Sequence, residues 1–240
     1  MFEDLKEKVV IAYKKAADKG FSADDIFVSV KESIDGKDYF AIKGTVFIIV
    51  DSDCSIVEGS STKFPEAFFM HYLLYKTYPF MNCIINASSK WISVWAGTGK
   101  PLPPVTVFHT RHFFGEIPCA VRIPDISDTH NIYVKIGTSV LKTISTKFVY
   151  QCPAVFVRAL GCITWGKDAE QTVSRLFALE EIAQRTYLIG IKKLETFTYL
   201  PYELSLKNYF LTADSLPLDY KIQRNEFLEQ WIKNCEEIVK

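Results

Sequence analysis

The sequence predicts one domain of the α/β class, and three observations lead to this prediction. The chain has 240 residues, which is long for one domain of ~100 to 200 residues but short for two. Hydrophobic residues make up 48% and charged residues 23%, a mixture that excludes a disordered or fibrous chain. Segments with a helical period also alternate with β-branched and aromatic segments. We therefore expect a single domain over residues 1–240.

The charge balance excludes several classes of partner. There are 28 basic and 28 acidic residues, so no excess of positive charge is available to bind nucleic acid or an anionic membrane. The start, MFEDLKEKVV, lacks the apolar stretch of a signal peptide, and no apolar run approaches the ~20 residues that span a bilayer. We expect a cytoplasmic protein whose six scattered cysteines are reduced.

The first third of the chain predicts a helix followed by a β-hairpin. Residues 3–18 follow a helical period and Gly20 is a plausible stop. The expected buried face of this helix consists of Leu5, Val9, Ile11, Ala12 and Ala16. The segments 26–33 and 39–51 are rich in β-branched and aromatic residues, and Asp35-Gly36 between them is a tight-turn signal.

The middle of the chain predicts short elements separated by proline and glycine. Residues 65–78 have a helical pattern that Pro79 ends, and CIINAS, residues 83–88, is a short apolar strand. Residues 89–97 indicate a helix closed by Gly97, followed by the loop KPLPP. Further short strands are expected within 117–123 and 154–158.

The clearest helix begins after Asp168. Asp168 is suited to cap it, and Gln171 stands three residues on, where a capping-box partner reaches back. The expected buried stripe consists of Val173, Leu176, Phe177, Ile182, Ala183 and Tyr187. Residues 190–240, with a last helix from about Asn225, are interpreted as a C-terminal arm or lid.

Three stretches together resemble one known family. They are ALGCITWGKDAEQTVSRLFALEEIAQRTYL (159–188), KFPEAFFMHYLLYKTYPFMNCIINASSKWISVWAGTGKPLPP (63–104) and FFGEIPCA (113–120). In this order and with these gaps they are similar to the class II aldolase/adducin family, whose members include fuculose-phosphate aldolases, ribulose-phosphate epimerases and the adducin head domain. The resemblance implies a three-layer α/β/α fold with a mostly antiparallel central sheet, and a homotetramer.

The resemblance also implies a zinc site, and this chain has lost its ligands. In the family three imidazoles hold zinc, which stabilises an enediolate during carbon–carbon cleavage or epimerisation. The strand His-x-His falls on Asn86 and Ser88, the third histidine falls on Leu160, and the catalytic carboxylate falls on Ala67. Asn and Ser are weak neutral donors and Leu donates nothing. We therefore expect neither a metal nor another cofactor.

The phosphate-binding segments of the family are altered as well. The Ser-Gly-Asn segment aligns with Asp25-Ile26-Phe27, and a second segment falls near Lys43-Gly44. Small residues are needed there so that backbone N–H groups can approach phosphate, and bulky Ile26 and Phe27 prevent this. A substrate phosphate is expected to find little to bind.

A relocated active site is the alternative to lost chemistry. Glu66, one residue before Ala67, is a replacement for the carboxylate if the helix start is re-registered. His109 and His112, in HTRH, could hold zinc if a third ligand such as Glu116 joined them. The competing interpretation is a pair of histidines at the surface or at a pocket edge.

Taken together, these observations predict a non-catalytic pseudo-aldolase that acts as a structural, regulatory or ligand-binding module, as the adducin head domain does without catalysis. The alternative is a sugar-phosphate aldolase or epimerase that uses Glu66, His109 or His112 and zinc. A third class is a small-molecule sensor that uses the old cleft, made more apolar by Ile26, Phe27 and Leu160. The sequence leaves these alternatives open.

Overall fold

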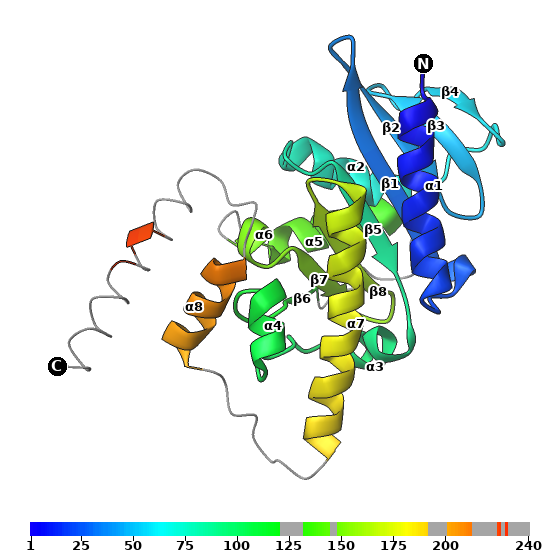
Figure 1. The fold of residues 1–240 in the computed structure, drawn as a ribbon. Coiled ribbons are helices and arrows are strands. Elements are labelled where there is room, and N and C mark those ends of the chain that lie inside the picture. The colour runs from blue at the N-terminus through cyan, green and yellow to red at the C-terminus, as the bar shows by residue number, and fades with distance from the viewer. Residues whose placement is uncertain (121–131, 145–147, 192–200, 213–224, 227–228, 230–240) are drawn as a thin grey trace.

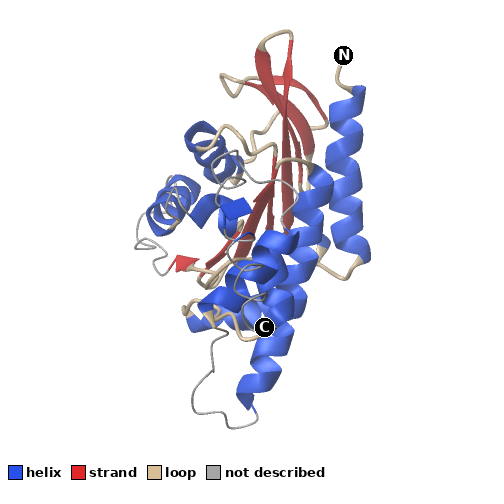
Figure 2. Ribbon diagram, turned by 60° about the vertical axis from the view of Figure 1, so that its left-hand side comes forward, coloured by secondary structure: helices blue, strands red, loops and turns tan. Residues whose placement is uncertain are grey.

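The protein folds into three layers, with helices on both faces of one sheet (Figure 2). The computed structural model describes residues 1–120, 132–144, 148–191, 201–212, 225–226 and 229 (Figure 1). The predicted α/β class with a mostly antiparallel sheet is confirmed, because every strand pair is antiparallel except β6 with β7.

Eight strands form the sheet in the order β4-β3-β2-β1-β5-β8-β7-β6. The strand that carries Asn86, β5, therefore lies in the middle of the sheet, between β1 and β8. The strands are β1 Ile26–Ile34, β2 Lys37–Lys43, β3 Phe47–Asp51, β4 Ile56–Gly59, β5 Cys83–Ala87, β6 Cys119–Ala120, β7 Ala154–Val157 and β8 Gly161–Gly166.

Two hydrophobic cores lie on opposite faces of the sheet. On the first face pack α1, α3 and α7, and on the second pack α2, α5 and α6. The helical elements are α1 Glu3–Asp18, η1 Ala23–Asp25, α2 Phe68–Thr77, α3 Lys90–Thr98, α4 Val107–His112, α5 Ile132–Thr143, α6 Phe148–Gln151, α7 Ala169–Ile191 and α8 Tyr202–Thr212. Alternate residues of each central strand serve the two cores, because side chains of a strand point to opposite faces in turn.

The first helix and the hairpin form as predicted, with small differences. Leu5, Val9, Ala12 and Ala16 are buried, but Ile11 is 42% exposed and does not belong to the buried face. The segment 39–51 is divided into β2 and β3, because the chain turns at residues 44–46. The edge strand β4 was not predicted, since its four residues are short and mostly exposed.

Two helix boundaries differ from the prediction. The helix α3 ends with Gly99 in the left-handed conformation, at φ 66°, and Gly97 lies inside it. The helix α2 begins at Phe68, three residues later than expected. Both differences are of the size expected where caps rather than periodicity decide the end of a helix.

The capping of α7 follows the predicted residues. The backbone N–H of Gln171 donates to Oδ1 of Asp168 at 2.7 Å, and Oε1 of Gln171 accepts from the backbone N–H of Lys167 at 3.1 Å. Val173, Leu176, Ile182 and Ala183 are buried and Phe177 is partly buried, whereas Tyr187, which was predicted to belong to this stripe, is 36% exposed.

The helices α5 and α6 were not predicted. The structure places α5 beside α2 on the second face. Of the predicted arm, α8 is described and packs against α4 (Figure 1). Of the predicted last helix from about Asn225, residues 225, 226 and 229 are described and are helical, whereas Cys235 and part of the strand segment 117–123 lie outside the described residues.

The described cysteines are free thiols, and four of the five are buried. No helix in the described part of the chain is long and apolar enough to cross a membrane.

Candidate functional site

Positions 86, 88 and 160, which the family resemblance aligns with zinc ligands, lie near one another at one end of the central strands. Asn86 pairs in register with Ile163 of β8 on one side and with Phe27 of β1 on the other. Ile84 and Ile163 both belong to the second core, so Asn86, two residues after Ile84 on the same strand, faces that side. Ser88 follows the end of β5, and its Oγ lies 2.6 Å from Oγ of Ser93 in α3.

The turn before β8 brings Leu160 to the same end. Gly161 has φ 124°, and a Cβ added to it would lie 2.4 Å from the carbonyl oxygen of Ala87. Only glycine fits such a close approach of two backbones. Ala159 also has a positive φ of 63°. The turn therefore presses against the end of β5, and the Leu160 side chain packs against the second core.

Phe27 fills the place where the two expected phosphate segments meet. A Cβ on Gly44 would lie 2.9 Å from Cδ2 of Phe27, so the ring rests on the Gly44 backbone. The same ring lies 5.2 Å from the His71 imidazole in an edge contact. Ile26, by contrast, is buried in the first core on the opposite face. The prediction that Ile26 lines the cleft is therefore wrong, because strand alternation turns it away.

A buried polar network lies next to Phe27. Oγ of Ser29 is 2.8 Å from Nδ1 of His71 and 2.9 Å from the Tyr75 hydroxyl, which donates to the Ser29 carbonyl at 2.9 Å. Burial lowers the pKa of His71 from 6.5 to about 3, and it raises the pKa of Tyr75. Both side chains are therefore neutral at physiological pH, which suits a fully buried network.

The start of α2 holds the other candidate positions. Ala67 is the N-cap residue and makes no side-chain hydrogen bond, while Glu66 is exposed and its backbone carbonyl accepts from the N–H of Phe69. An exposed carboxylate on the loop before a helix has no special chemical environment.

The histidines of HTRH belong to no group of three or more His, Cys, Asp or Glu side chains that could hold a metal ion among the described residues. Nε2 of His109 is 2.8 Å from the carbonyl oxygen of Gly115, and a carbonyl can only accept, so this nitrogen donates. Burial lowers the pKa of His109 to about 4. Burial, and next the nearby Arg175 cation, lower the pKa of His112. His109 is buried in α4, which contacts α7 and α8, whereas Glu66 precedes α2 on the opposite face. The structure does not bring these salvage candidates into one site.

Sequence reasoning missed Glu180, which organises the chain after the candidate site. Its carboxylate accepts from Oγ of Ser89 at 2.5 Å and from the backbone N–H groups of Trp91 at 3.2 Å and Ile92 at 3.0 Å. Ser89 is the N-cap of α3 and makes no cap bond of its own. The Leu-Glu pair in α7 was the only available signal, and it does not indicate a partner 91 residues away.

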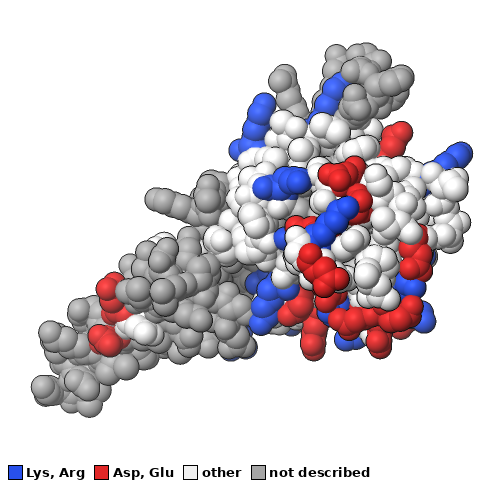
Figure 3. All heavy atoms as spheres, turned by 90° about the horizontal axis from the view of Figure 1, so that it is seen from above, with Lys and Arg blue, Asp and Glu red and all other residues white. Residues whose placement is uncertain are grey.

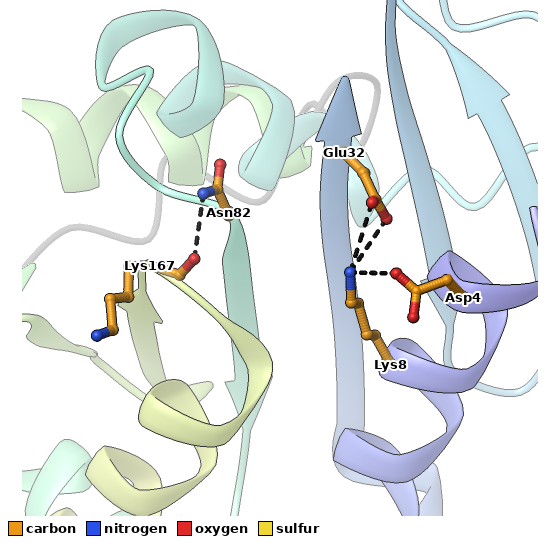
Figure 4. Close-up of polar contacts among 5 residues, drawn as sticks. All are labelled: Asp4, Lys8, Glu32, Asn82 and Lys167. Carbon is orange, nitrogen blue, oxygen red and sulfur yellow. Dashed lines mark hydrogen bonds and ion pairs between the residues drawn. The ribbon is translucent and has the colours of Figure 1, made fainter. Parts of the chain in front are cut away.

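A cavity of about 720 Å³ lies elsewhere, between α1, β1 and the start of α7. Its floor includes Ala12, Val30 and Val173. On one side Lys8 binds Asp4 and Glu32, and on the other Asn82 donates to the Lys167 carbonyl at 3.1 Å (Figure 4). Acidic and basic side chains lie close together on the face seen from the N-terminal end (Figure 3). The charges at this cavity largely neutralise each other.

The comparison with known proteins agrees with this geometry. The family model "Class II Aldolase and Adducin N-terminal domain" matches residues 22–187, which include β1, β5, β8 and most of α7. The chain belongs to the class II aldolase and adducin family. The predicted family is thereby confirmed.

Individual relatives of this class II aldolase family member are distant. L-ribulose-5-phosphate 4-epimerase UlaF of Salmonella paratyphi C is 26% identical over 153 residues, which are 64% of this chain and 67% of that protein. An L-fuculose 1-phosphate aldolase structure matches with a TM-score of 0.69 and 16% identity, over 86% of this chain and 94% of that one. An aldolase II superfamily protein from Pseudomonas syringae matches with a TM-score of 0.67 and 13% identity, over 96% and 93%.

Class II aldolases usually use zinc, and the residues at positions 86, 88 and 160 do not fit that ion. Zinc sites in proteins draw their ligands from His, Cys and carboxylates, whereas Asn86 and Ser88 offer neutral oxygens and Leu160 offers hydrocarbon. Oγ of Ser88 is also paired with Oγ of Ser93 at 2.6 Å. Among the residues that the structure describes, no group of three or more His, Cys, Asp or Glu side chains could hold a metal ion.

Proposed function

We propose that this chain is a non-catalytic member of the class II aldolase family, which uses the fold as a binding module rather than for zinc chemistry. The observation that carries the proposal is the side-chain set at the shared end of β1, β5 and β8. Phe27, Asn86, Ser88 and Leu160 stand there, and none of them is a good zinc ligand or a general acid or base.

The phosphate region supports the same proposal. The Phe27 ring rests on Gly44, where backbone N–H groups would have to approach an anion. Without the electrophile and without binding energy from the phosphate, both sources of transition-state stabilisation are weakened.

The test measures zinc and turnover in the same purified sample. Protein purified without any chelator should contain far less than one zinc per chain. Its reaction rate with L-fuculose 1-phosphate and with L-ribulose 5-phosphate should equal the rate in buffer alone. A turnover of about 1 per second, at the low end for enzymes, would refute the proposal. It would favour an active epimerase or aldolase, the activity in the name of the 26% identical relative.

A gain-of-binding variant tests the assignment of the positions. The triple change Asn86→His, Ser88→His and Leu160→His should raise zinc occupancy toward one per chain. The matched control, Asn82→His with Thr138→His and Ser174→His, adds three imidazoles just before β5, on α5 and on α7, and should not. Equal occupancy in both folded variants would mean that the positions are misassigned.

A further inference from the structure

Two buried hydrogen-bonding atoms near Phe27 have no partner among the described residues. They are Oδ1 of Asn86 and Nε2 of His71. Buried polar atoms in folded proteins are nearly always paired, so an exception requires an explanation such as a bound ligand. Asn86 is the register partner of Phe27, and the imidazole lies 5.2 Å from the Phe27 ring.

Both atoms are hydrogen-bond acceptors. Tyr75 donates its hydroxyl hydrogen to the Ser29 carbonyl, which leaves Oγ of Ser29 to donate to the phenol oxygen. Oγ of Ser29 then accepts from Nδ1 of His71, 2.8 Å away. This assignment places the imidazole hydrogen on Nδ1 and leaves a lone pair on Nε2. The amide oxygen of Asn86 accepts by nature, so a complementary ligand has to donate.

The surrounding side chains select against charge. Phe27, Asn86, Ser88 and Leu160, which we call the cleft-edge group, are each partly exposed and uncharged. A cation would find no carboxylate in this group, and an anion would meet lone pairs and the Phe27 ring. Moving an ion out of water without a partner is costly. Hydroxyl groups meet the acceptors without this cost, and the C–H groups of a polyol pack on Phe27 and Leu160.

We propose that the cleft-edge group binds an uncharged polyhydroxy compound, a sugar or polyol without phosphate, whose hydroxyl group donates to Oδ1 of Asn86. This inference rests on the proposed function, because a zinc ion at these positions would change the chemistry of recognition. A phosphate-binding cleft binds the phosphate ester more tightly, whereas the cleft-edge group binds the unphosphorylated compound more tightly.

The experiment titrates L-fuculose, L-ribulose and xylitol into the full-length protein by ligand-observed NMR, with L-fuculose 1-phosphate as the charged counterpart. At least one uncharged compound should bind at least tenfold more tightly than the phosphate ester. Asn86→Leu should weaken that binding about tenfold, the scale for leaving a polar ligand group unpaired. Asn82→Leu, a matched change just before the same strand, should not. If Asn86→Leu does not fold, Phe27→Leu carries the test and should weaken binding as well.

Three results would overturn this inference. One is the absence of binding by all three uncharged compounds at concentrations on the order of 10 mM. The others are tighter binding of the phosphate ester, and equal affinity in wild-type protein and in the folded variants. Failure of the proposed function gives a different result, namely zinc and turnover, so the two failures can be told apart.

Discussion

Replacement of Glu180 by alanine should destabilise the protein by removing the cap of α3. The carboxylate accepts three hydrogen bonds at the start of this helix, from Ser89, Trp91 and Ile92. Two of these donors are backbone N–H groups that have no partner inside the helix. The negative charge also lies at the positive end of the helix dipole.

The expected loss in unfolding free energy is about 3 kcal/mol. A single hydrogen bond to a charged group makes a net contribution of about 1.5 to 3 kcal/mol to stability, but three bonds to one carboxylate are not additive. Loss of a helix cap alone costs about 1 kcal/mol, and the dipole interaction contributes up to about 1 kcal/mol at a half-buried position. In a chain of this size 3 kcal/mol corresponds to a fall in Tm of about 6 to 12 °C.

Urea denaturation followed by circular dichroism measures this loss, with Glu181→Ala as the control. Glu181 is the next residue, and it pairs with Arg185 at the surface, where an ion pair contributes about 0 to 1 kcal/mol. Glu180→Gln retains one acceptor and should fall between the two. A loss in Glu180→Ala no larger than in Glu181→Ala would show that the carboxylate does not hold the helix.

Three further predictions concern pH, packing and assembly. Burial lowers the pKa of His71 from 6.5 to about 3, so the stability that depends on its neutral form is complete above pH 6.5 and is lost as the pH falls. Between pH 7 and pH 5, the unfolding free energy of the wild type should decrease by about 2 kcal/mol more than that of His71→Gln. An equal decrease in unfolding free energy in both proteins would contradict this prediction. Gly44→Ala should lower the unfolding free energy by about 1 to 2 kcal/mol in chemical denaturation, because the new Cβ would lie 2.9 Å from the Phe27 ring. The loss should be much smaller when Phe27 is also replaced by alanine. An equal loss in that double variant would mean that the clash involves another residue. Light scattering should give four times the chain mass of 27.4 kDa, and a particle of single-chain mass at micromolar concentration would argue against a tetramer.

Periodicity and turn chemistry were sufficient for the elements with strong local signals. The helix α1, the β1–β2 hairpin and the cap of α7 by Asp168 and Gln171 follow from residues close together in the chain. The edge strand β4 was missed because its four residues are few and mostly exposed. The helix α5 was missed although its 12 residues are amphipathic.

At the candidate site, too, features with a local sequence signal could be predicted, and features that depend on packing could not. The orientation of Asn86 toward the second core could be predicted from strand alternation, whereas Ser88 lies beyond the end of β5 and bonds to Ser93 of α3. The contact of Phe27 with Gly44 and His71, and the reach of Glu180 to α3, depend on pairings between distant segments, for which one sequence holds no local signal. Ile26 was misplaced for a different reason: residues 26–33 were predicted as a strand, but strand alternation alone does not tell which face of the strand Ile26 occupies.

Alternate side chains of the central strands pack in two different cores, so the residues of β5 that hold the first core and the residue at the candidate site lie on different faces of the sheet. Along β5, Cys83, Ile85 and Ala87 pack in the first core, while Asn86 faces the other side. Substitutions at the even-numbered positions therefore leave the packing beneath α1, α3 and α7 unchanged. The side chain at position 86 can therefore change without altering the residues of β5 that hold the first core, and the same alternation allows new recognition chemistry to arise on that side.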